Sequence, residues 1–274
     1  MITGLLDFPA VQPLPSTGRD YLSFSAIRLY QGCPLRFHFK YNLGLPDDSV
    51  SSALVLGSAV HRAIELHFRE QLSGNPPPSS DALLGEFWEE WKERDLEQIR
   101  FGKGEDRESV GLLAERILTA FQQSEVAQPL GQILAVEEEL RGPLVPGCPD
   151  VLGRVDLIVD TGSELVVSDW KTARSRWSQE QAEDAAEQLI LYSELAKDFA
   201  PGKPVKLEFV ILTKAKEPVV DRHLLPVDPA QVARTKRVVE NVWRAIEANC
   251  FYPAPSAMNC PSCPYRSQCR KWSG

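Results

Sequence analysis

A stretch near the middle of the chain, Gly153 to Lys171, constrains the fold more than any other part of the sequence. It reads GRVDLIVDTGSELVVSDWK, in which two apolar runs, at 155–159 and 165–167, flank the turn-forming residues 160–163. Apolar runs on both sides of such a turn are typical of a β-hairpin. We therefore expect two adjacent antiparallel strands at the centre of the protein.

Three charged residues interrupt this hairpin, namely Asp156, Asp169 and Lys171. A carboxylate among Val, Leu and Ile loses hydration energy on burial, and a bound cation is one of the few partners that can compensate two such acids together. Because side chains two residues apart on a strand project from the same face, Lys171 is placed beside Asp169. A metal and an ammonium group together suit a phosphate, so the hairpin is predicted to form half of a phosphodiesterase site.

Periodicity and capping signals predict the elements around the hairpin. Helices are expected at 23–30, 54–72, 81–100, 108–123, 178–197 and 229–248, and further strands at 133–140, 205–213 and 219–225. On the helix at 81–100, Trp88 and Trp91 are expected to pack into the core. This order predicts an α/β fold with a mixed central sheet flanked by helices.

The domain organisation follows from the same signals. Residues 1–22 are expected to form a flexible N-terminal arm, and residues 23–274 a single domain. Within that domain, 75–130 is predicted to be a helical insert and 250–274 a cysteine-rich tail.

The charge and hydropathy of the chain exclude some classes of protein. A net charge of −8 argues against a surface coated in basic residues for nonspecific nucleic-acid binding, although Lys171, Arg174 and Arg176 form a local basic cluster. No apolar run reaches the roughly 18 to 20 residues that a membrane span needs, and the N-terminus lacks a signal pattern. We expect a cytoplasmic protein without a membrane partner.

Four of the six cysteines form a set that resembles a metal site. The tail reads CPSCPYRSQC and holds Cys260, Cys263 and Cys269, which leaves a tetrahedral site one ligand short. Cys33, which also precedes a proline, is the best candidate for the fourth. Disulfides are rare inside cells, so metal binding is the better explanation. Zinc and a [4Fe-4S] cluster both accept four cysteines, and spacing alone does not decide between them.

Four short motifs occur in a fixed order along the chain. They are GSAVH at 57–61, GRVD at 153–156, DWKT at 169–172, and Gln188 followed by Tyr192. In these motifs and in the cysteine spacing, the chain from about residue 23 onward resembles the RecB-like branch of the PD-(D/E)XK nucleases. The resemblance is to the iron-sulfur members, which include the AddB nuclease domain and the CRISPR-associated adaptation exonuclease. It implies a restriction-endonuclease-like sheet, with a cysteine-bound cluster that staples the two ends of the chain together.

The resemblance implies a metal site made by residues that are far apart in sequence. His61, Asp156 and Asp169 would ligate a divalent cation with help from the Trp170 carbonyl, and Glu137 matches a recurrent family acid. Oxygen ligands favour Mg²⁺ or Mn²⁺, and the imidazole favours Mn²⁺ of the two. The residues themselves leave another interpretation open, in which Asp156 and Asp169 form structural salt bridges with Arg154 or Lys171.

The resemblance also implies roles for the remaining motif residues. Lys171 would orient or deprotonate the attacking water and neutralise charge on the scissile phosphate. Gln188 and Tyr192 would line the site and position the DNA strand. Because these two residues lie four apart on a helix, they could equally form a face that packs on the sheet.

Two functions of different classes follow from this reasoning. The first is a metal-dependent DNA exonuclease that acts on single-stranded ends in DNA repair, recombination or CRISPR adaptation, with a [4Fe-4S] cluster. The second is a DNA-binding or scaffolding subunit of a larger repair or CRISPR-adaptation complex, in which cutting is incidental or gated by a partner. Incubation with Mn²⁺ and labelled single-stranded DNA separates the two.

Overall fold

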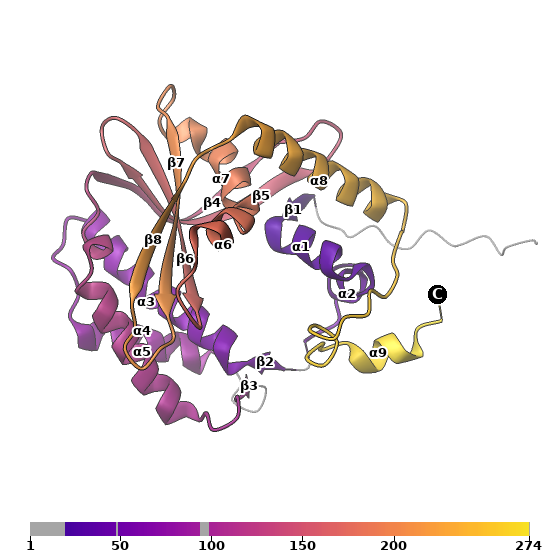
Figure 1. Cartoon of the computed structure of the whole chain (residues 1–274), viewed down its shortest axis with the longest axis horizontal. Coiled ribbons are helices and arrows are strands. Elements are labelled where there is room, and N and C mark those ends of the chain that lie inside the picture. Colours follow the sequence, from indigo (N-terminus) through magenta and orange to yellow (C-terminus); the bar gives the residue numbers. More distant parts are fainter. Residues whose placement is uncertain (1–19, 48, 94–98, 274) are drawn as a thin grey trace, which may run out of the picture.

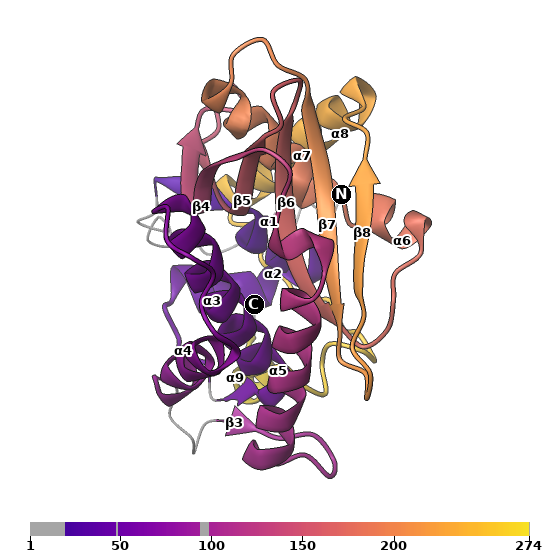
Figure 2. The same cartoon turned by 90° about the vertical axis from the view of Figure 1, so that its left-hand side faces the viewer.

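The computed structural model describes residues 20–47, 49–93 and 99–273, and a mixed sheet with helices on both faces lies at its centre (Figures 1 and 2). The strands are β1 (Tyr21–Ser23), β2 (Val50–Ser51), β3 (Ile99–Arg100), β4 (Gln132–Gly142), β5 (Asp150–Asp160), β6 (Leu165–Ala173), β7 (Val205–Thr213) and β8 (Val220–Leu225). The helices are α1 (Phe24–Gly32), α2 (Pro34–Phe37), α3 (Ser52–Leu72), α4 (Ser80–Lys92), α5 (Arg107–Gln122), α6 (Gln179–Asp184), α7 (Glu187–Ala196), α8 (Pro229–Glu247) and α9 (Arg266–Lys271), with short π and 3₁₀ turns at His38–Asn42, Glu125–Ala127 and Lys197–Phe199. The predicted α/β class and the central hairpin, β5 and β6, are confirmed.

The main sheet has six strands in the order β1-β5-β6-β7-β8, with β4 on the other edge of β5. β5 pairs antiparallel with β4 from Val151 to Asp160. On its opposite edge, β5 pairs with β1 at 150–152 and with β6 at 157–160. Residues 153–156 therefore pair on this edge with no strand among those described, and a fork opens in the sheet where β6 separates from β5.

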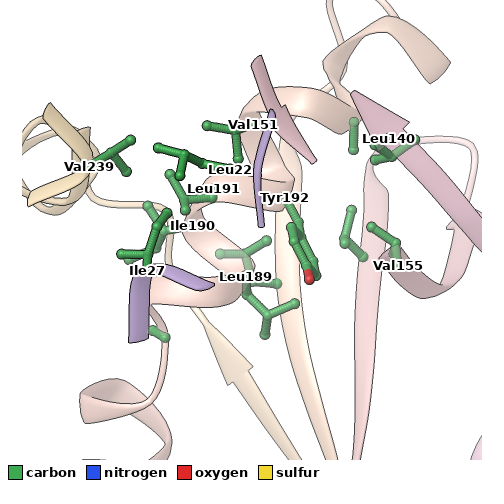
Figure 3. Packing of buried hydrophobic residues seen from close by; sticks show 14 of the residues in the cluster. Leu22, Ile27, Leu140, Val151, Val155, Leu189, Ile190, Leu191, Tyr192 and Val239 are labelled. Carbon is green, nitrogen blue, oxygen red and sulfur yellow. The ribbon is translucent and has the colours of Figure 1, made fainter. Parts of the chain in front are cut away.

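Each face of the sheet carries its own hydrophobic core. Alternation along the strands sends Val167 and Phe209 to the face covered by α1, α6, α7 and α8, and Val210 and Leu212 to the face covered by α3, α4 and α5 (Figure 1). Figure 3 shows the first core, where Ile190 of α7 lies beside Ile27 of α1 and the Tyr192 ring lies between α7 and Val155 of β5. Trp91 is fully buried in the second core and Trp88 packs against it, as the helical spacing of the pair predicted.

The predicted helix at 178–197 is two helices, so that expectation was wrong. α6 begins with a capping box between Ser178 and Gln181 and ends at Asp184, and α7 begins at Glu187. The two helices pack on different strands. α6 contacts β8, whereas α7 contacts β4 to β7. No Gly or Pro marks the break. The break follows from packing against the sheet, which buries Ala182 before the break and Ala186 at the start of α7.

Two other predicted boundaries also differ from the structure. The helix predicted at 81–100 ends at Lys92, residues 94–98 lie outside the described part, and Ile99–Arg100 form β3 beside β2. Most of the predicted N-terminal arm, residues 1–19, also lies outside the described part, while Tyr21 and Leu22 belong to the sheet. Within the residues described, none of the helices combines the length and the apolar character needed to cross a membrane.

Candidate active site

The fork between β5 and β6 positions Asp156. The ladder between these strands ends at Leu157 and Ser168, and beyond it the Trp170 backbone N–H donates a 2.6 Å hydrogen bond to Asp156 Oδ2. The carboxylate thus takes the place of a strand carbonyl, so the N–H remains satisfied although the strands separate. The Asp156 side chain is 11% exposed.

Glu137 approaches the same point from β4. The pairs Val136–Leu157 and Glu138–Val155 place it opposite Asp156, and its φ of 50° is left-handed. A non-glycine residue in this region costs on the order of 1–3 kcal/mol, and such strain concentrates at functional sites. Arg154 Nε lies 2.9 Å from Glu137 Oε2. Local periodicity predicts an ordinary strand here, so this backbone conformation could not be predicted from the sequence.

His61 completes a group of three possible metal ligands. It lies on α3, which begins at a Ser51 cap, and its Nδ1 is 3.7 Å from Asp156 Oδ2. One ligand atom each from His61, Glu137 and Asp156 lies within 4.8 Å of the others. Two carboxylates and one imidazole form a donor set that fits Mg²⁺ or Mn²⁺.

Asp169, which the resemblance implied as a ligand, is paired differently from these three residues. Its Oδ2 lies 2.6 Å from Lys171 Nζ, and its side chain is 3% exposed. This ion pair matches the structural salt bridge left open by the sequence. It also holds the Lys171 ammonium group close enough to interact with Asp156, and Lys171 shares a cavity with His61 and Glu137.

Gln188 and Tyr192 connect α7 to Lys171. Lys171 Nζ donates a 3.2 Å hydrogen bond to Gln188 Oε1, and Gln188 Nε2 donates one of 2.9 Å to the Tyr192 hydroxyl. The two residues predicted to share a helix face therefore form a chain of hydrogen bonds that ends on the lysine. Tyr192 is also a core residue, 5% exposed, which agrees with the interpretation of this pair as a helix face packed on the sheet.

The glycine of the GRVD motif makes room for Tyr192. A Cβ added to Gly153 would lie 2.3 Å from Tyr192 Cε1, far inside van der Waals contact. Figure 3 shows the Tyr192 ring in the core with Val151 and Val155 of β5. Gly57 of the first motif makes room for Thr172 in the same way but less tightly, since a Cβ added to Gly57 would lie 3.3 Å from Thr172 Oγ1.

Burial and crowded charge shift the pKa values of the site residues. Burial raises the pKa of Asp156 to about 8, with the Asp169 carboxylate adding to the effect, and raises that of Glu137 to about 7, with Asp156 adding to it. Burial lowers the pKa of His61, against the attraction of Asp169 and Glu137. Burial also opposes charge on Lys171, but Asp169 and Asp156 outweigh it and raise its pKa. The negative charges of Asp156 and Glu137 are therefore poorly compensated without a bound cation.

Part of the site lines a cavity of about 790 Å³ between α3 and the ends of β6 and β7. His61, Glu137 and Lys171 reach it, and so does Trp170, whose indole is buried at 2% exposure. The cavity also contains Arg62, Arg154 and Lys214, which the motifs did not single out. Of these, only Arg154 lies inside a motif, as the second residue of GRVD.

The four predicted cysteine ligands line one cavity of about 240 Å³. It lies where α1 meets α2 at Cys33 and where the tail returns toward α2 with Cys260, Cys263 and Cys269 (Figure 1). In the described part of the chain, no three of these thiols converge to within 4.8 Å. The structure thus gives the four cysteines a common location without showing a cluster or a staple.

Hydrogen bonds join the two ends of the chain at this place. Leu35 N donates to Tyr252 O over 3.0 Å. The Tyr265 hydroxyl lies 2.6 Å from Asp47 Oδ1 and 3.0 Å from Leu45 O. Tyr265 packs fully buried against Leu35 and Phe39. The tail is thus fastened to the N-terminal helices by contacts other than metal ligation.

Comparison with known proteins agrees with this geometry. The model of the PD-(D/E)XK nuclease superfamily matches residues 21–270. Among solved structures, the "Putative exonuclease" of Eubacterium rectale is 16% identical over 92% of this chain and 88% of that chain, with a TM-score of 0.59, which shows a shared fold.

Two further structures match less well. SSO0001 is 15% identical over 82% of this chain and 87% of that chain, with a TM-score of 0.37, and Rai1 of Scheffersomyces stipitis is 11% identical over 83% and 69%, with a TM-score of 0.24. No curated protein matches the sequence. Because the family model spans nearly the whole chain, the protein belongs to the PD-(D/E)XK nuclease superfamily.

Proposed function

We propose that the protein is a RecB-like, metal-dependent deoxyribonuclease that removes nucleotides from single-stranded DNA ends. The observation that carries the proposal is the convergence of His61, Glu137 and Asp156, two of which line the same cavity as Lys171. Acids and a cationic lysine at one point suit the hydrolysis of a phosphodiester, whose charge must be neutralised as water attacks.

In this proposal the three convergent residues hold Mg²⁺ or Mn²⁺, with Asp169 and the Trp170 carbonyl nearby. The cation supplies Lewis acidity at the phosphate when it is bound. Lys171 orients the attacking water and neutralises charge on the phosphate oxygens. Asp169 and Gln188 keep its ammonium group in place, and Tyr192 in turn holds Gln188.

We propose further that the cysteine-lined cavity holds a [4Fe-4S] cluster. The common location of Cys33, Cys260, Cys263 and Cys269 supports this, as does their spacing. A zinc ion bound at about 2.3 Å from each sulfur needs thiols that converge more closely than these do, so a larger group suits the cavity better. Iron and acid-labile sulfide analysis tests the assignment, and a colourless protein with stoichiometric zinc would refute it.

The place of the enzyme in DNA repair, recombination or CRISPR adaptation is part of the same proposal and rests on the resemblance in motifs and cysteine spacing. It includes the possibility of partner proteins from those systems. The exonuclease mode draws support from the structural similarity to the Eubacterium rectale protein, which is itself described as a "Putative exonuclease".

The decisive experiment uses three DNA substrates with Mn²⁺ or Mg²⁺, namely end-labelled linear single strands, circular single strands, and blunt duplex. We expect degradation of the linear strand and resistance of the circle. Cleavage of the circle would show an endonuclease, and DNA binding without cleavage of any substrate would favour the scaffolding role. The Lys171→Ala variant, prepared in parallel, controls for a contaminating nuclease.

A further inference from the structure

The charges that line the active-site cavity are unevenly paired. Four cationic side chains reach the cavity, and carboxylates neutralise three of them. The pairs are Arg62 with Glu65 and Glu86, Arg154 with Glu137, and Lys171 with Asp169, at 2.6–3.2 Å. For the fourth, Lys214, the described residues offer no ion pair. An unpaired cation in a partly desolvated cavity is an unfavourable arrangement that an anionic ligand would relieve.

Main-chain hydrogen bonding places Lys214 beside a second cation. Its N–H donates a 2.7 Å hydrogen bond to Ala173 O, which continues the parallel register of Ala173 with Thr213 by one step. Lys214 and Arg174 are therefore neighbours across β6 and β7, about 4.8 Å apart in the backbone. Like charges in such positions repel each other. The half-buried Lys214 has a lowered pKa, caused by burial first and Arg174 second.

One acid interacts with both cations but forms an ion pair with neither. Glu105 lies close enough to interact electrostatically with both Lys214 and Arg174. Its carboxylate, however, accepts hydrogen bonds from Ser52 Oγ at 2.7 Å and from Gly102 N at 2.9 Å, and it makes no ion pair with either cation within 4.0 Å. Lys214 lines the cavity, whereas Arg174 is exposed and lies outside its lining, so an anion that enters the cavity meets Lys214 first.

We propose that Lys214, with Arg174, binds a backbone phosphate of the DNA strand adjacent to the phosphate that is cleaved. The proposal rests on the proposed nuclease function, which supplies the DNA. Arg174 lies one residue beyond the end of β6 and three residues beyond Lys171, about 10 Å away along the backbone, which favours a different phosphate from the one beside Lys171. Thr172, which lies between them in sequence, also lines the cavity. Lys214 would fix the position of the strand without contacting the reacting atoms.

Lys214→Gln removes the charge while keeping much of the side chain. Binding of single-stranded DNA is measured with Ca²⁺ in place of the catalytic metal, over a range of salt concentrations. We expect affinity to fall by about tenfold and the slope of log K against log salt to fall by about 0.7, as for one lost phosphate contact on a single strand. In cleavage assays KM should rise in parallel, while kcat stays within about twofold.

Matched variants separate a specific contact from a general loss of charge. Lys214→Arg should retain most of the affinity, and Arg174→Gln should weaken binding in the same direction as Lys214→Gln. Lys216→Gln removes a charge from an exposed position two residues away, outside the cavity, and should bind like the wild type.

Substrates with a single neutral methylphosphonate linkage identify the phosphate itself. We expect one linkage position at which neutralisation weakens binding to the wild type but not to Lys214→Gln. Wild-type affinity and salt slope in Lys214→Gln would overturn the inference while leaving the nuclease function intact. A wild-type protein that neither binds nor cleaves single-stranded DNA would overturn both, so the two failures are distinct.

Discussion

The Trp170 backbone N–H donates a 2.6 Å hydrogen bond to Asp156 Oδ2 at the point where β5 and β6 separate. This contact joins the two halves of the predicted hairpin and explains why an acid lies among apolar residues. The carboxylate bridges the two strands where they separate. Its side chain is 11% exposed, and its Oδ2 lies 3.7 Å from His61 Nδ1. The same contact therefore shapes the sheet and positions a metal ligand.

Asp156→Asn should abolish cleavage and yet stabilise the metal-free protein at neutral pH. The folded-state pKa of Asp156 is raised to about 8 from an ordinary value of 3.8, so the folded protein favours the neutral form. The stability that this proton contributes is fully present below about pH 4 and is lost as the pH rises toward 8. Asn does not titrate. In chelator, the melting temperature of the variant should therefore exceed that of the wild type increasingly between pH 5 and 8.

Divalent metal should reverse that ranking. Mn²⁺ should raise the melting temperature of the wild type more than that of Asp156→Asn, because a ligand that binds the folded state adds stability that grows with the ratio of its free concentration to its Kd. If the melting temperatures of the two proteins in chelator changed with pH by the same amount, Asp156 would not hold a proton in the folded wild type. Equal responses of the two proteins to Mn²⁺ would contradict the metal site.

Lys171→Ala should reduce kcat by at least about a hundredfold, the usual loss when one preorganised group that stabilises transition-state charge is removed. It also leaves Asp169, 3% exposed, without its partner, so part of any loss could reflect weaker folding. The double variant Asp169→Asn/Lys171→Met removes both charges and serves as the stability control. It should melt closer to the wild type than Lys171→Ala does and remain inactive. Normal turnover by Lys171→Ala would exclude the proposed mechanism.

Much of the fold and part of the site could be predicted from local patterns. The hairpin, the strand before it and the helix that carries His61 follow from apolar periodicity and caps, which depend on residues near each other in sequence. The ordered motifs pointed to His61, Asp156, Lys171 and Gln188, and the structure brings these side chains together.

The remaining features depend on tertiary context. The left-handed backbone of Glu137 arises opposite the fork, and the break between α6 and α7 arises because they pack on different strands. Lys214 enters the cavity because β7 runs parallel to β6 and ends beside it. No local pattern around these residues distinguishes them from an ordinary strand, helix or loop, so the sequence alone could not identify them.

Cys263→Ser should remove iron and acid-labile sulfide from the purified protein and lower its melting temperature. The thiol belongs to the cavity shared by the four cysteines, so its loss would leave a cluster with three ligands. Cys250→Ser is the matched control, because Cys250 is exposed and lies outside that cavity. Full iron content in Cys263→Ser, or equal losses in both variants, would argue against a cluster at this place.

Gly153→Ala should destabilise the protein through one contact. The new methyl group would lie 2.3 Å from the Tyr192 ring, which α7 holds in a core that cannot yield without moving the helix. Overpacking of this kind costs typically 1–3 kcal/mol of unfolding free energy. Gly85→Ala is the control, since Gly85 lies on α4 with no atom within 4 Å of the added Cβ, and helix propensity predicts a gain of up to about 1 kcal/mol there.

A double-mutant cycle assigns the effect of Gly153→Ala to Tyr192. Tyr192→Ala creates a cavity in the core, and adding Gly153→Ala should then cost little because the clashing ring is absent. Urea denaturation of the four proteins gives the coupling free energy, which we expect to be at least about 1 kcal/mol in favour of the double variant. Because Tyr192 supports Gln188, and Gln188 contacts Lys171, Gly153→Ala should also lower kcat under conditions where the protein is fully folded. Additive costs in the cycle would show that the glycine serves another purpose.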